Sequence, residues 1–211
     1  MGAKTWMIVY SNGNVCESLK SSANIDRNKT IELTKKLFPN ENLVSIEDGN
    51  LSYTCPPDNT IYAGYFSGVF IVAAKEFGID YPSRLKSSFI DPSYGNSIQL
   101  HAMHSVVDWF AFAVWRNGIL ERSLSLSPDR GVIEDYGEKL PFEQPYWNGE
   151  HPAVGPDDEY PLKFHPLEMG EAALAEFFGY VLEGPIGAST IEPEDVPLLG
   201  FKRSRLWWKF W

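Results

Sequence analysis

The apolar residues between positions 97 and 136 follow a pattern that predicts the centre of a β-sheet. Apart from Asp108, every residue of the segment 108–115 (DWFAFAVW) is apolar. Side chains of a strand alternate between its two faces, so a strand with this pattern must be covered on both sides. A further strand is expected to begin at 98–101.

The residues after this strand predict an antiparallel hairpin. Asn117-Gly118 is the strongest short-range hairpin signal, because both residues accept a positive φ angle. The returning segment 119–126 places Leu124 and Leu126 on a buried face. A turn at 127–131 and a strand at 132–136 follow, so the whole stretch predicts an antiparallel meander.

Four other segments have interpretable patterns. Residues 4–10 (KTWMIVY) predict a buried strand. Asp26 can cap a helix over 27–38, and apolar residues at helical spacing predict a helix over 166–183, ended by Gly184-Pro185. Residues 60–74 fit either two short strands or a buried helix.

The remaining segments are less regular. Residues 12–25 show little periodicity and are expected to be a loop, and a short helix is expected over 82–88. The Pro-rich stretch 140–166 is expected to wrap over the sheet in an ordered, irregular form. The predicted fold is therefore α+β, with an antiparallel or mixed sheet centred on residues 97–136 and helices packed on its face.

The composition is that of one globular domain, and the chain is expected to lie in a reducing compartment. The 211 residues are 44% hydrophobic and 22% charged, as in ordinary globular proteins. No apolar run approaches the ~20 residues that span a bilayer, and the first residues lack the features of a signal peptide. A cytoplasmic location is therefore expected, with Cys16 and Cys55 as thiols.

Charge is distributed unevenly along the chain. Residues 134–195 hold fifteen Asp and Glu against Lys139 and Lys163, a net charge of −13, whereas residues 201–211 (FKRSRLWWKFW) hold four basic residues and no acid. Affinity for phosphate backbones comes from clustered Lys and Arg, so the acidic body argues against a nucleic-acid partner.

The histidines and a nearby aspartate are the candidate catalytic residues: His101, His104, Asp108 and His151. His101 and His104 lie three apart, and strand residues three apart face opposite ways, which argues against a metal pair. With His165, the group could instead converge on a sheet edge as a general acid–base site. No nucleotide-binding or zinc motif occurs, so no cofactor and no metal are expected.

The candidate binding residues are Trp207, Trp208 and Trp211 in the tail 202–211, and Arg130 at the predicted turn 127–131. Trp and Arg dominate the energetics of many interfaces. The tail could lie on a membrane surface, but docking on its own acidic domain or on a second copy is the more economical interpretation. For Arg130, a place in an exposed charged pair at a type I turn is much the commoner role.

Several long motifs carry a resemblance to a known family: MGAKTWMIVY, LHAMHSVVDWFAFAVW, RSLSLSPDRGVIEDYGEKLPFEQPYW, YPLKFHPLEMGEAAL, FFGYVLEG and PEDVPLLGF. On these motifs the chain resembles an uncharacterised bacterial family that is known as a domain of unknown function. The resemblance runs to about Phe201 and implies that residues 1–201 form one unit. It implies no activity, cofactor or catalytic residue.

Two functional hypotheses follow from these observations. The first is a non-enzymatic cytoplasmic binding or protein-interaction domain that uses the aromatic sheet edge or the tail. The alternative is a small hydrolase-like enzyme with a His/Asp acid–base group. Two or more histidines and a carboxylate within hydrogen-bond reach of one another in one cavity would favour the second hypothesis, and histidines that are scattered or buried singly would remove it.

Overall fold

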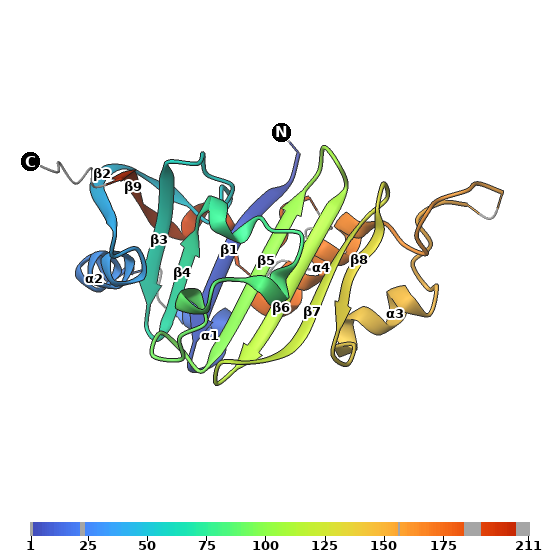
Figure 1. Ribbon diagram of the computed structural model, residues 1–211, viewed down its shortest axis with the longest axis horizontal. Helices are drawn as coiled ribbons and strands as arrows, with labels where there is room; N and C mark the ends of the chain where they lie inside the picture. Colours follow the sequence, from blue (N-terminus) through green and yellow to red (C-terminus); the bar gives the residue numbers. More distant parts are fainter. Residues whose placement is uncertain (1, 22–23, 156, 184–190, 206–211) are drawn as a thin grey trace, which may run out of the picture.

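The computed structural model shows a nine-stranded antiparallel sheet with helices on both faces, which confirms the predicted α+β fold (Figure 1). It describes residues 2–21, 24–155, 157–183 and 191–205. The strand order is β2-β9-β3-β4-β1-β5-β6-β7-β8. The strands are β1 Lys4–Ser11, β2 Glu41–Asn50, β3 Thr60–Phe66, β4 Val69–Ala73, β5 Ser97–His104, β6 Trp109–Arg116, β7 Ile119–Ser127, β8 Gly131–Tyr136 and β9 Pro197–Arg205. The helices are α1 Val15–Ser21, α2 Arg27–Leu37, α3 Gln144–Trp147 and α4 Pro166–Phe178.

Strand β1 is the middle strand of the nine and joins the two halves of the sheet. It pairs with β4 on one side and with β5 along its whole length on the other. Five of its last six residues are apolar, and Met7, Ile8 and Tyr10 have no exposed surface. The predicted meander β5-β6-β7-β8 forms one half of the sheet, and β2, β9, β3 and β4 form the other.

Two hairpin turns of the sheet are formed by residues with positive φ angles. Asn117 (φ 51°) and Gly118 (φ 78°) close the β6-β7 hairpin, as their sequence predicts. Residues 60–74 form a second hairpin, in which Ser67 and Gly68 turn the chain between β3 and β4. This ambiguous segment is therefore a pair of strands.

Two apolar layers cover the sheet. On one face, α1 and α4 pack on the central strands together with Tyr146 of α3 and Phe164 of the irregular segment that follows it. On the other face lie α2 and the short 3-10 turns, including Lys75–Phe77. Strand β6 is buried on both faces, as its apolar pattern requires.

Three predicted boundaries were wrong. The expected loop 12–25 contains helix α1, which buries Val15 and Leu19 under the sheet. Helix α4 ends at Phe178 rather than 183, because Gly179 adopts the left-handed conformation that closes a helix. The expected helix at 82–88 is two separate 3-10 turns, Pro82–Arg84 and Ser87–Phe89.

Strand β9 extends the sheet beyond the point where the tail was expected to begin. Residues 202–205 pair with β2, from Val44↔Lys202 to Glu41↔Arg205. The first four residues of the predicted tail are therefore part of the sheet, and its tryptophans at 207, 208 and 211 lie outside the described residues. No helix in the described part of the chain is long and apolar enough to cross a membrane.

Candidate functional site

Three cavities open next to one another around the start of β1. The β1 cavity has a volume of about 560 Å³ and the α4 cavity about 650 Å³; they share Ala3 and Glu183. The third, the turn cavity, has about 350 Å³ and shares Trp6 with the β1 cavity. Residues of the short segment from Gly2 to Trp6 therefore line all three cavities.

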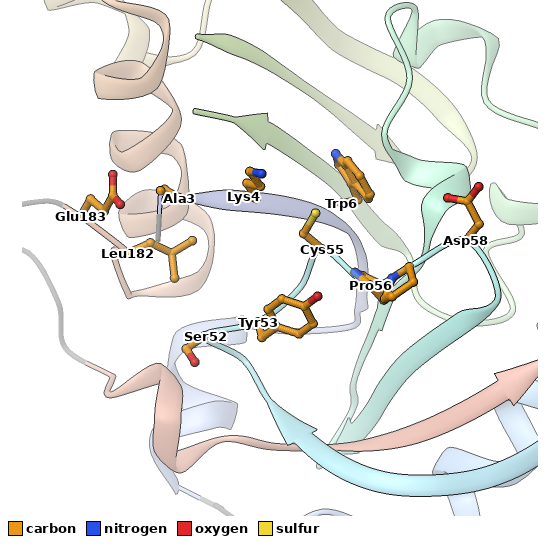
Figure 2. A pocket seen from close by; sticks show the side chains of 12 residues that line it. Ala3, Lys4, Trp6, Ser52, Tyr53, Cys55, Pro56, Asp58, Leu182 and Glu183 are labelled. Atoms are coloured by element: carbon orange, nitrogen blue, oxygen red, sulfur yellow. The ribbon is translucent and has the colours of Figure 1, made fainter. Parts of the chain in front are cut away.

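The β1 cavity lies between β1, the segment after β2 and the residues after α4 (Figure 2). The thiol of Cys55 points toward β1 between Lys4 and Trp6, and Leu182 and Glu183 lie on the opposite side. Burial raises the pKa of the Cys55 thiol, against the lowering effect of Lys4 and Lys75. The thiol is therefore protonated at neutral pH and is a weak nucleophile.

Trp6 separates the β1 cavity from the turn cavity. The ammonium of Lys75 lies 4.3 Å from the centre of its ring, and the ring of His104 stacks on it at 6.3 Å. The indole thus has both a cation and an imidazole ring against it.

The turn cavity brings together two of the candidate residues, His104 and Arg130. Burial lowers the pKa of His104, and the nearby charge of Lys4 lowers it further, so the ring is neutral at pH 7. Arg130 forms an ion pair with Asp80 at 2.5 Å, and both side chains are about half exposed. The guanidinium is thus already engaged by a carboxylate.

The α4 cavity combines an apolar wall with three carboxylates. Its described lining comes from Ala3, from Tyr146 and His151, and from the region between His165 and Glu183, which contributes Leu167, Glu168, Glu171, Ala172, Ala175 and Val181. The ring of His151 stacks on Tyr146 with a centroid distance of 4.6 Å. No Lys or Arg is among the described residues that line this cavity.

Glu171 ties the chain after α4 to the helix. Its two carboxylate oxygens accept the backbone N–H groups of Leu182 (2.7 Å) and Glu183 (3.1 Å). Burial raises the pKa of Glu171, whereas these two hydrogen bonds lower it. The side chain therefore positions residues 182–183 against both the α4 cavity and the β1 cavity.

His165 lines the α4 cavity, and each of its ring nitrogens faces another group. Its Nδ1 accepts the backbone N–H of Leu167 and thereby caps α4. Its Nε2 lies 3.6 Å from Oδ2 of Asp108. Asp108 sits in the β5-β6 turn with a φ of 45°, so a strained turn residue faces the start of the helix.

His101 is a structural residue beneath α4. Its Nε2 donates to the carbonyl of Gly170 (2.9 Å), because a carbonyl can only accept, and its Nδ1 therefore accepts the hydroxyl of Thr5 (2.6 Å). The ring has no exposed surface, and burial lowers its pKa to about 4. It joins β5, β1 and α4.

The structure does not gather the four candidate catalytic residues into one group. His101 is sealed in the core, His104 faces the turn cavity, Asp108 lies beside His165, and His151 lines the α4 cavity. Among the described residues, no group of three or more His, Cys, Asp or Glu side chains could hold a metal ion.

The sequence interpretation missed the carboxylates of the α4 cavity. Glu168 and Glu171 were visible as acidic residues in a helix, but only the contact of α4 with residues 181–183 places them around a hollow. Their spacing of three residues on one helix face was the available signal.

A family model matches residues 5–201, from the second residue of β1 to the middle of β9. No curated protein and no solved structure matches the chain. The match covers the sheet, both helical layers and nearly all residues around the three cavities. The chain therefore belongs to the family of unknown function DUF6928.

Proposed function

We propose that this chain is a non-enzymatic binding domain whose α4 cavity receives a positively charged ligand with an apolar body. The volume of about 650 Å³ lies within the range of small-molecule sites, roughly 300–1,000 Å³. Such sites are mainly apolar and orient their ligand with a few polar groups, and the α4 cavity has this composition.

The charges around the cavity support a cation. Glu168, Glu171 and Glu183 contribute carboxylates, and the described lining contains no basic side chain other than the two histidines. A guanidinium or ammonium group forms charge-assisted hydrogen bonds with such oxygens. Leu167, Ala172 and Val181 offer an apolar surface for the remainder of the ligand.

The same geometry gives less support to the hydrolase alternative. Both ring nitrogens of His165 already face partners, the Leu167 amide and Asp108, so the ring is not placed as a general base toward the cavity. The described lining of the α4 cavity contains no Ser, Thr or Cys that could serve as a nucleophile. One observation supports the proposal most strongly: three carboxylates and an apolar wall line the same large cavity.

Isothermal titration with phenylalanyl-arginine amide, a cationic dipeptide with an aromatic body, tests this proposal. The probe should bind, and phenylalanyl-glutamate, of similar size but opposite charge, should not. Glu168→Gln should weaken binding roughly three- to tenfold, because one exposed carboxylate contributes about 1 kcal/mol. Glu176→Gln, on the same helix but outside the lining of this cavity, is the matched control and should leave binding unchanged. Equal binding of both probes, or of neither, contradicts the proposal.

A cytoplasmic location belongs to the same proposal. The sequence supports it, because it contains only two cysteines and no apolar run near the ~20 residues that span a bilayer. Fractionation of cells that express the chain tests the location, and recovery in the membrane or extracellular fraction contradicts it.

A further inference from the structure

One end of the sheet carries an exposed apolar strip, which we call the β2 strip: Val44, Ile46, Tyr53 and Tyr62. Val44, Ile46 and Tyr53 are 56%, 37% and 45% exposed. Val44 lies opposite Lys202 and Ile46 opposite Gly200 on β9. Because alternate residues of β9 share a face, these side chains lie on the same face as the buried Leu198.

Gly200 keeps the strip continuous across three strands. A Cβ at this position would collide with Ile46 on β2 and approach Tyr62 on β3. Tyr53 meets Tyr62 edge to face with a centroid distance of 6.2 Å. Single exposed apolar side chains are ordinary, but a contiguous row on neighbouring strands is typical of an interaction surface.

The strand that carries the strip is a free and acidic edge. Within the described residues, β2 is an end strand that pairs only with β9. Its sequence, ENLVSIEDGN, contains three acidic residues and no basic one. An unpaired edge presents backbone N–H and C=O groups that can accept another strand.

The chain beyond the described residues has the complementary character. Residues 206–211 read LWWKFW, with one leucine, four aromatic residues and one lysine. Aromatic residues favour extended strands. The described chain ends at Arg205, which is paired with Glu41 at the beginning of β2.

The direction of β9 argues against a return of this segment to its own strip. Reaching Ile46 would require the chain to reverse immediately after Arg205, and residues 205–211 contain no Gly, Pro, Asn, Asp or Ser to form the turn. A second copy is therefore the partner that this geometry favours.

We propose that two copies of this chain form a dimer in which residues 206–211 of each copy lie along β2 of the other and cover its β2 strip. The contact is reciprocal, so it closes as a twofold-symmetric pair. The lysine at 209 meets a strand that carries Glu41, Glu47 and Asp48.

The available surface is large enough for such a dimer. Because the side chains of a strand alternate, two of the four aromatic residues can face the strip, and at about 150 Å² each they cover about 300 Å² per segment. Two segments and the two surfaces that receive them give about 1,200 Å², which is the lower end of the range for a specific interface.

Light scattering coupled to size-exclusion chromatography tests the proposal on the full chain and three variants. The full chain should have twice the chain mass of 23.8 kDa, and deletion of residues 206–211 should give the monomer mass. Val44→Lys should also give a monomer, because it removes an apolar side chain from the strip and adds a second positive charge beside Lys202. Val106→Lys is the matched control: this valine is 73% exposed in the β5-β6 turn, away from β2, and its variant should remain a dimer.

A monomeric full chain overturns the proposal, as does a dimer that survives the deletion. A dimer that survives Val44→Lys overturns the assignment of the receiving surface. Circular dichroism of each variant verifies the fold, and if Val44→Lys does not fold, the deletion decides the outcome alone.

Discussion

Glu143 holds the guanidinium of Arg122 with two hydrogen bonds at a place where neither side chain is exposed. Arg122 Nε donates to Oε1 at 2.9 Å and Nη2 donates to Oε2 at 2.6 Å. Asp135 on β8 accepts a third bond from the same guanidinium at 2.5 Å. The Pro-rich segment after β8 is thereby fastened to β7.

Replacing Glu143 by Gln should lower the free energy of unfolding by about 3–5 kcal/mol, because a buried cation loses its main counter-charge. Chemical denaturation measures the loss. Glu121→Gln is the control: Glu121 lies 3.6 Å from Arg116, both side chains are about half exposed, and the cost should be at most about 1 kcal/mol. Equal losses of unfolding free energy in the two variants would show that burial does not determine how much these ion pairs contribute to stability.

The burial of His101 predicts a specific dependence of stability on pH. Its pKa is about 4 in the folded chain and about 6.5 when unfolded, so the unfolded chain binds more protons between these values. The stability from neutral His101 is complete above pH 6.5 and is lost as the pH falls toward 4, a total of about 3 kcal/mol.

Unfolding measured at pH 7 and pH 4.5 should therefore show a larger loss in the wild type than in His101→Gln, by about 2–3 kcal/mol. His151→Gln is the control, because this histidine is exposed and its variant should retain the pH dependence of the wild type. If His101→Gln retains it as well, the ring does not titrate as the structure indicates.

Gly131, the first residue of β8, and Gly137, which follows the strand, should respond differently to alanine. Both have positive φ angles, 66° at Gly131 and 83° at Gly137. A Cβ at Gly131 would meet open space, so Gly131→Ala should cost about 1 kcal/mol. A Cβ at Gly137 would fall on the carbonyl oxygen of Glu121, so Gly137→Ala should cost roughly 3 kcal/mol or more. Thermal unfolding of both variants compares them, and similar midpoints would refute the difference.

The parts of the fold that were predictable from sequence rest on local signals. Asn117-Gly118 specifies its hairpin through backbone conformation alone, and Asp26 caps α2 by accepting the Lys29 amide. The apolar composition of residues 108–115 predicts a strand that is buried on both faces, and β6 is such a strand.

The parts that were missed depend on contacts between distant residues. Arg122 alternates with leucines in the sequence, and nothing local shows that Glu143, 21 residues later, neutralises it in the core. Strand β9 is held by pairing with β2 and β3, more than 130 residues earlier in the chain. The end of α4 was predicted at Gly184-Pro185, but the left-handed conformation of Gly179 ends the helix at Phe178.

The candidate site was less predictable than the fold for the same reason. The α4 cavity needs Ala3, His151 and residues 165–183 to meet, and this meeting follows from the central position of β1 and the packing of α4 beneath it. Histidines drew attention in the sequence because of their chemistry. The carboxylates that define the cavity stood among many other acidic residues of the region, and only the spacing of Glu168 and Glu171 on one helix face set two of them apart.

The central claim is that the α4 cavity is the ligand site, and amide NMR of the full chain titrated with phenylalanyl-arginine amide tests it most directly. The account predicts shifts that saturate at residues 167–175 and at Ala3, with helix α2 (27–37) unperturbed on the opposite face of the sheet. Saturating shifts confined to α2, or none at residues 167–175, would contradict it.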